Sequence, residues 1–140
     1  MTTPTPEQVD AWFAQAADIT LEGMRAGTGG PFGATLVHDG EVVVSVGNTV
    51  LKDTDPSGHA EMVAVREACR RLGTLDLSGM VMYATCEPCP MCMGAILWAR
   101  LDRVWYAATR EEAALAGFDD SYFYEQVALG PGERAVPMGR

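Results

Sequence analysis

Three of the chain's four cysteines lie in the segment TCEPCPMC at residues 85–92. Cys89 and Cys92 are separated by two residues, and side chains at this spacing at the start of a helix share one face, so both sulfur atoms can reach one metal ion. The positive end of a helix also favours the thiolate, which is the form that binds metal. The segment therefore predicts a metal site, whose other ligands decide its chemistry.

Three kinds of site are possible if these cysteines act alone or with one or two further residues. The spacing of Cys86, Cys89 and Cys92 resembles part of an iron–sulfur motif, but a four-thiolate cluster would then need Cys69, which lies inside a predicted helix. A closed structural zinc site would use all three cysteines and a histidine. A single CxxC pair is also typical of a redox site. A further interpretation uses His59 and its neighbours.

The triplet His59-Ala60-Glu61 precedes the PCPMC segment, and together they form the H-x-E and P-C-x-x-C signature of zinc deaminases. His59, Cys89 and Cys92 would be three ligands and would leave the fourth tetrahedral position to water, whose pKa zinc lowers to about 7. Glu61 would then carry protons rather than bind the metal. The joint pattern is far more specific than its parts, and it predicts a catalytic zinc site.

Taken singly, these residues have ordinary explanations. His59 alone would be a surface or core histidine, and Glu61 alone would be a solvated helix residue. Cys86 is expected to pack behind the ligands, because a fourth thiolate would close the metal to water. Cys69 is expected to be a buried small apolar residue.

The elements that must position these residues alternate between helices and strands. The Asp39-Gly40 pair is a strong signal for a two-residue hairpin turn, and the pattern fades after Val127. This order predicts an α/β layered fold with a mixed sheet, in a single domain over residues 1–140. Helices are expected from Thr5 to the break at Gly27–Pro31, from Asp55 to near Gly73, from Pro88 through Trp98 and over Arg110–Ala116, and strands over Ala34–His38, Glu41–Val46, Val81–Ala84 and Val104–Ala107.

The composition narrows the classes of partner. No apolar run approaches the roughly 18 residues of a membrane span, and the N-terminus lacks a signal-peptide pattern, so we expect a cytoplasmic protein without a membrane partner. Thiols stay reduced in that compartment, which favours metal binding over disulfides. The formal net charge is −9, and an acidic surface repels phosphates, so a nucleic-acid partner is not expected.

The sequence resembles the cytidine deaminase-like superfamily from about Gly23 to Val136, and within it the bacterial guanine deaminases. The segments Gly29–Ala34 (GGPFGA), His59–Glu61 and Thr85–Cys92 resemble several branches, including tRNA adenosine deaminases. Ala116–Ser121 (AGFDDS) is more selective and resembles the guanine deaminases. The resemblance implies a three-layer α-β-α fold around a central mixed sheet, with one Zn²⁺ per chain.

The resemblance also implies roles for individual residues. His59, Cys89 and Cys92 would hold zinc. The remaining residues are Glu61 as proton carrier, Asp120 as a second acid near the leaving amine (with Asp119 as the fallback), Asn48 on the purine edge, Phe32 against the base, and Ala60 among the substrate-binding residues. Each of the more distant ones has a structural alternative: Asn48 could cap a strand end, Phe32 could be core, and the aspartate pair could be a solvated turn.

The function implied is zinc-dependent hydrolytic deamination of a free purine base, most readily guanine to xanthine and ammonia, by a homodimer. A nucleoside deaminase (guanosine, adenosine or cytidine) or an aminotriazine deaminase is the alternative with the same chemistry. A tRNA adenosine deaminase should carry a basic surface, whereas this chain has 10 Lys and Arg against 19 Asp and Glu. A non-catalytic zinc module would have no use for Glu61 beside an open metal position.

One departure from the resemblance concerns the C-terminus. The guanine deaminases continue with an aromatic-containing tail that closes over the substrate and can swap between subunits, whereas this sequence ends at Pro137-Met138-Gly139-Arg140. We therefore expect a shorter closing tail or none. Tyr122, Phe123 or Tyr124 would cover the site instead, or would pack in the core.

Overall fold

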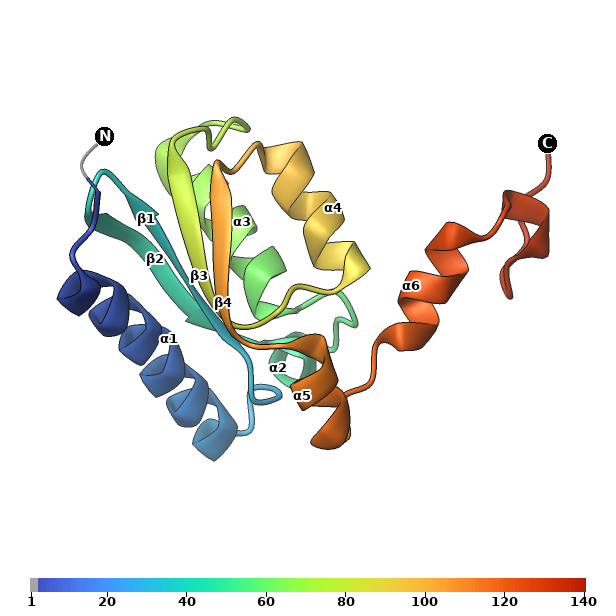
Figure 1. Cartoon of the computed structure of the whole chain (residues 1–140), viewed down its shortest axis with the longest axis horizontal. Helices are drawn as coiled ribbons and strands as arrows, with labels where there is room; N and C mark the ends of the chain where they lie inside the picture. The colour runs from blue at the N-terminus through green and yellow to red at the C-terminus, as the bar shows by residue number, and fades with distance from the viewer. Residues whose placement is uncertain (1–2) are drawn as a thin grey trace.

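The computed structural model describes residues 3–140, which form a four-stranded sheet between two layers of helices (Figure 1). The strand order is β2-β1-β3-β4. β1 pairs antiparallel with β2 and with β3, while β3 and β4 run parallel. The expected mixed sheet and three-layer α-β-α fold are therefore confirmed. The strands are β1 (Gly33–His38), β2 (Glu41–Gly47), β3 (Met80–Cys86) and β4 (Arg103–Ala108).

Helix α1 covers one face of the sheet, and α3 and α4 lie on the other (Figure 1). α1 begins with the expected capping box, in which Thr5 and Gln8 satisfy each other's backbone N–H, and it ends at Gly27 with φ 72°. The hairpin between β1 and β2 turns at Asp39 and Gly40, both with positive φ. The helices are α1 (Pro6–Ala26), α2 (Val50–Asp53), α3 (Ala60–Leu72), α4 (Pro90–Ala99), α5 (Arg110–Leu115), α6 (Ser121–Ala128) and the short 3₁₀ helix η1 (Pro131–Glu133).

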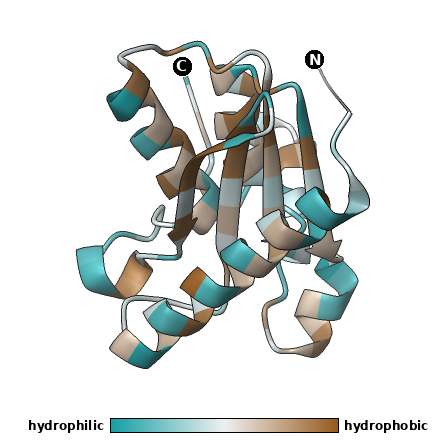
Figure 2. Ribbon diagram, turned by 90° about the vertical axis from the view of Figure 1, so that its left-hand side faces the viewer, coloured by the Kyte–Doolittle hydropathy of each residue, from teal (hydrophilic) through white to brown (hydrophobic). Residues whose placement is uncertain are grey.

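Alternating side chains of the strands build two cores, one on each face of the sheet. Met82 and Leu36 face α3 and α4, where they pack with the small residues of α3. Tyr83 points to the opposite face and packs against Trp12 of α1, with ring centroids 5.0 Å apart. Hydrophobic residues run along the strands in the middle of the molecule, and the surrounding helices carry both hydrophobic and hydrophilic residues (Figure 2).

Two helix starts differ from the expectation, and both differences affect the site. The helix expected from Asp55 begins only at Ala60, because the Asp55 carboxylate accepts hydrogen bonds from the backbone and hydroxyl of Ser57 and so forms a turn. The helix expected from Pro88 begins at Pro90. His59 and Cys89 thereby become the N-cap residues of α3 and α4.

The pattern was expected to fade after Val127, and no helix was expected between Ala116 and Val127, but the chain after α5 contains α6 and the short η1. This part of the chain extends away from the sheet (Figure 1). Within residues 3–140, no helix is long and apolar enough to cross a membrane.

Candidate active site

The three expected metal ligands lie together at the N-terminal ends of α3 and α4. His59 Nδ1 is 3.5 Å from the Sγ atoms of both Cys89 and Cys92, and the two Sγ atoms are 3.6 Å apart. A tetrahedral zinc with Zn–S of about 2.3 Å and Zn–N of about 2.0–2.1 Å would place its sulfur ligands about 3.8 Å apart and nitrogen about 3.6 Å from sulfur. The donor set and its spacing therefore fit one zinc ion.

The two N-caps explain how residues so far apart in sequence meet. His59 and Cys89 both have extended backbone angles, and their carbonyls accept the first bonds of α3 and α4 from Val63 and Met93. Cys92 lies in the first turn of α4. The positive ends of two helices thus converge on the ligand atoms and stabilise thiolates.

The metal-free ligand group already favours one thiolate. Hydrogen bonds with Cys92 and with His59 lower the pKa of Cys89 to about 4. The hydrogen bond with Cys89 and burial raise the pKa of the Cys92 thiol. The hydrogen bond with Cys89 raises the pKa of His59. Zinc binds the thiolate form of Cys92 and the neutral form of His59, so metal binding competes with protons at both residues.

Glu61 lies beside the ligand group and is only 5% exposed. Its Oε2 accepts a hydrogen bond from the Cys92 thiol at 3.2 Å. Burial raises the pKa of the Glu61 carboxyl. A carboxyl that takes up a proton more readily than usual can accept one proton and deliver it again within the same turnover.

These groups open onto a cavity of about 480 Å³, which lies within the range of small-molecule sites. Its charged walls are acidic, and neither Lys nor Arg is among its lining residues. The lining residues come from the β1 and β2 ends, α2, α3, the loop after β3, and α5 to α6: Gly30, Phe32, Asn48, Val50, Leu51, His59, Glu61, Cys86, Glu87, Cys89, Ala113, Gly117, Phe118, Asp119, Asp120 and Phe123.

Asn48 and Phe32, which were expected to contact a purine, both line this cavity. Asn48 is 8% exposed, and its Oδ1 accepts a hydrogen bond of 3.0 Å from the Val50 backbone. That bond fixes the amide so that Nδ2 lies toward Gly30, where it can donate to a ligand. A Cβ at Gly29 would collide with the Asn48 carbonyl, which explains the glycine at this position.

The two adjacent aspartates both line the cavity, but their surroundings differ. Asp119 is exposed, and its Oδ1 accepts a 2.9 Å hydrogen bond from the Ser121 backbone at the start of α6. Asp120 is half-buried in the cavity wall, where burial raises the pKa of its carboxyl. Phe123 also lines the cavity, whereas Tyr122 and Tyr124 are not among the lining residues.

The side chains of three other residues from the sequence analysis neither bind the metal nor carry protons. Ala60 is fully buried in the core and does not line the cavity, so any contact with a substrate would come from its backbone N–H at the first position of α3. Cys86 lines the cavity, and burial raises its thiol pKa to about 11. Cys69 packs against the core. Within residues 3–140 neither cysteine belongs to the metal-ligand group, which disfavours a four-cysteine cluster.

Sequence reasoning missed several residues of the cavity wall. Val50 and Leu51 lie on the single turn of α2, and Phe118 packs its ring edge-on against Phe32 at 5.1 Å. Glu87 also lines the cavity, and for this residue a signal was available, because an acidic side chain stands between Cys86 and Pro88, close to a predicted metal ligand.

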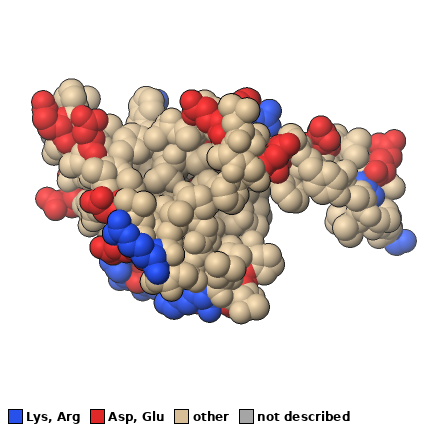
Figure 3. All heavy atoms as spheres, turned by 90° about the horizontal axis from the view of Figure 1, so that it is seen from below, with Lys and Arg blue, Asp and Glu red and all other residues tan. Residues whose placement is uncertain are grey.

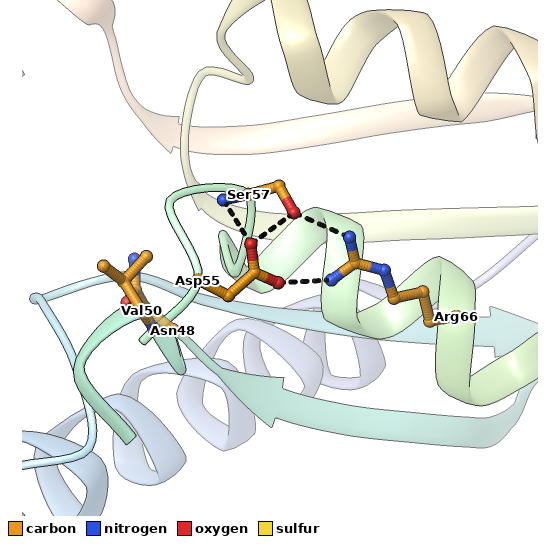
Figure 4. A network of polar contacts seen from close by, with 5 residues as sticks. All are labelled: Asn48, Val50, Asp55, Ser57 and Arg66. Carbon is orange, nitrogen blue, oxygen red and sulfur yellow. Dashed lines mark hydrogen bonds and ion pairs between the residues drawn. The ribbon is translucent and has the colours of Figure 1, made fainter. Parts of the chain in front are cut away.

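A polar network orders the turn before His59 (Figure 4). Ser57 Oγ donates to Asp55 Oδ1 at 2.7 Å and accepts from Arg66 of α3 at 2.8 Å, and Arg66 also pairs with Asp55 at 3.5 Å. The His59 backbone N–H donates to the Ser57 carbonyl at 2.8 Å. The network therefore ties the N-cap of α3 to the body of the same helix.

Comparison with known proteins agrees with this geometry. The family model described as "Cytidine and deoxycytidylate deaminase zinc-binding region" matches residues 6–108. The guanine deaminase of Bacillus subtilis (strain 168) is 45% identical over 129 residues, which is 92% of this chain and 83% of that protein. Its X-ray structure matches with a TM-score of 0.90 at 44% identity, covering 94% of this chain and 83% of that one. A tRNA-specific adenosine deaminase of Aquifex aeolicus is 45% identical over 78 residues, 56% of this chain and 52% of that protein.

Proposed function

The chain belongs to the cytidine and deoxycytidylate deaminase family of zinc-dependent hydrolases, and we propose that its substrate is guanine, which it converts with water to xanthine and ammonia. One observation carries the proposal: a single cavity is lined by two residues of the metal-ligand group, His59 and Cys89, and by the carboxyl-bearing residues Glu61 and Asp120. The match to a guanine deaminase over 92% of the chain supports the choice of base.

The metal supplies the nucleophile in this chemistry. Zinc held by His59, Cys89 and Cys92 would lower the pKa of a water molecule to about 7, so that hydroxide is available at neutral pH. The residues of the chain then have to move protons and hold the base.

Glu61 carries the first proton. It accepts a proton from the attacking water and passes it to a ring nitrogen of guanine, which makes C2 a better electrophile. Its buried position supports this role, because burial raises the pKa of the carboxyl and so makes it a better proton acceptor than an exposed one.

Asp120 carries the second proton. The tetrahedral carbon must expel the amino group as neutral ammonia, since an amide anion is a very poor leaving group. Asp120 lines the same cavity as Glu61, and burial raises its carboxyl pKa, so it can deliver a proton to the amine. As ammonia leaves, the C2 hydroxyl becomes a carbonyl and its proton restores the one that Asp120 delivered, so guanine and water have become xanthine and ammonia and both carboxyl groups are regenerated.

Asn48 and Phe32 orient the base. The Nδ2 group of Asn48 donates to an acceptor on the purine edge, while the Phe32 ring, held by Phe118, packs on the base face. These contacts would keep C2 aligned with the attacking water.

The charge of the chain supports a small neutral substrate over tRNA. The formal net charge is −9, and the charged carboxylates of the cavity wall would repel phosphates. The end of the molecule seen from below in Figure 3 carries acidic groups along much of its rim and only a limited group of basic ones.

We further infer a homodimer. Helix α4 and the edge strand β4 expose large apolar side chains, as does α6, and such surfaces in a folded chain are usually covered by a partner. The strongest cases are Leu97 and Trp98 on α4, Trp105 and Tyr106 on β4, and Phe123 and Val127 on α6. We also infer one domain over residues 1–140 and a cytoplasmic location, where the four cysteines would stay reduced and Cys89 and Cys92 could bind the metal.

Ammonia release from the zinc-loaded protein tests the substrate. We expect release from guanine, with xanthine as the second product, and little or none from guanosine, adenine, cytosine, cytidine or an aminotriazine. Release from cytidine or guanosine in the absence of activity on guanine would contradict the proposal.

A further inference from the structure

Asp120 lines the cavity, although the helix that follows it is exposed to solvent. It is the N-cap of α6, and none of the residues of α6 is buried. Only Tyr124 and Gln126 of this helix are even half-buried. Because α6 extends away from the sheet (Figure 1), the helix as a whole does not fix where Asp120 lies.

Tyr124 provides the missing attachment. Its hydroxyl donates a 2.9 Å hydrogen bond to the carbonyl of Pro88, the residue directly before Cys89. The guanidinium of Arg110 lies over its ring, 4.1 Å from the centroid. The Tyr124 backbone N–H points to the Asp120 carbonyl at 3.4 Å, so the two residues are one turn apart. Tyr124 thus joins the first turn of α6 to the metal-ligand loop.

The two partners of Tyr124 are themselves well fixed. Pro88 is buried, and the Arg110 backbone N–H donates to Glu87 at 3.3 Å, in the same loop. On the other side of the aspartates, Phe118 packs against Phe32. The segment that carries Asp120 is therefore held at one point before it and at one point after it.

We propose that Tyr124 is a positioning residue that holds the Asp120 carboxyl at the metal site by binding the Pro88 carbonyl. The proposal rests on the proposed function, because it assumes that Asp120 protonates the leaving amine of guanine. Tyr124 itself does not line the cavity, so it acts through Asp120 rather than on the substrate.

Tyr124→Phe is the sharpest test, because phenylalanine keeps the ring under Arg110 and removes only the hydroxyl. We expect kcat for guanine to fall roughly tenfold, since a displaced acid transfers its proton less efficiently, with KM and zinc content nearly unchanged. Tyr122→Phe is the matched control: Tyr122 is on the same helix, half its surface is exposed, and its ring packs on Phe123. This control should leave kcat unchanged.

A double-mutant cycle with Asp120→Asn separates positioning from general damage. If Tyr124 acts through Asp120, the loss from Tyr124→Phe disappears when Asp120 is already asparagine. An equal further loss in that background would overturn the proposal, because it would mean that Tyr124 supports the fold or another group.

Amide hydrogen exchange measures the attachment without any reference to turnover. In Tyr124→Phe the peptide spanning residues 117–124 should exchange faster, while the peptides of α3 should not change. If the wild-type protein does not deaminate guanine, the proposed function fails and the exchange still decides whether Tyr124 holds the segment. Unchanged exchange would overturn the attachment.

Discussion

At the scale of single residues, Glu61 has the most specific role in the site. Glutamine at this position keeps the size of the side chain and its ability to accept a hydrogen bond, but it cannot carry a proton. We predict that Glu61→Gln binds one zinc per chain and loses turnover by about 10²–10⁴-fold or more. Metal analysis and kcat for guanine check this outcome, with a thermal melt as the control for folding. Turnover within about threefold of wild type would exclude Glu61 as the proton carrier.

The adjacent aspartates give a paired prediction. Asp120→Asn should retain zinc and lose about 10²-fold in kcat, because asparagine cannot protonate the amine. Asp119→Asn should stay near the wild-type rate, since Asp119 is exposed and an asparagine oxygen can still accept the hydrogen bond from Ser121. Steady-state kinetics on guanine compare the two variants. The reverse order of effects would make Asp119 the acid.

The sequence predicted the metal ligands and Glu61 because the chemistry of a zinc site fixes residue types at fixed spacings. The choice of Asp120 over Asp119 came only from the family resemblance, since neighbouring identical residues differ only in their three-dimensional surroundings. Here a single backbone hydrogen bond to Asp119 separates them. The place of Val50 in the cavity wall could not be predicted for a related reason, because an apolar residue on a single helical turn has no distinctive sequence pattern.

At the scale of elements, the turn before α3 shows where local signals mislead. Asp55 followed by Pro56 is typical of a helix start, which is why a helix was expected there. In the structure the Asp55 carboxylate is occupied by Ser57 and Arg66, and the helix begins at Ala60 instead. The shift matters, because an N-cap His59 has the extended backbone that brings its ring to the cysteines.

The same network gives a prediction about metal affinity. Ser57→Ala removes the hydroxyl that bridges Asp55 and Arg66, so the turn that positions His59 should loosen. We expect zinc affinity to weaken about tenfold, the lower end of the range for supporting residues. Competition with a chromogenic chelator measures the change.

Ser78→Ala is the control for that experiment. Ser78 makes the same pair of bonds to Asp76, through its backbone and its hydroxyl, but in the loop before β3. Its loss should leave zinc affinity unchanged. Equal affinities in both variants and the wild type would show that the network does not position the ligand.

At the scale of the whole molecule, composition and element order predicted the layered fold and its mixed sheet, because alternating helices and strands leave few other arrangements. They did not predict α6. The apolar residues of α6 are exposed, so this helix has no face that is buried against the rest of the same chain. In the homodimer that we infer, this helix would pack against the second chain, and the sequence of one chain does not describe such a contact.

The homodimer itself can be tested at Trp98. This side chain is 87% exposed on α4, so its replacement by glutamate removes little packing from one chain and should change stability by no more than about 0.5 kcal/mol. In a dimer interface the same change would bury an unpaired charge, which costs several kcal/mol. We expect light scattering to give twice the 15.0 kDa chain mass for the wild type and a shift toward the single-chain mass for Trp98→Glu.

Leu21→Glu is the control, because Leu21 is an exposed apolar residue on α1, across the sheet from α4. It should leave the mass of the assembly unchanged. A wild-type protein that has the mass of one chain at micromolar concentration would contradict the dimer.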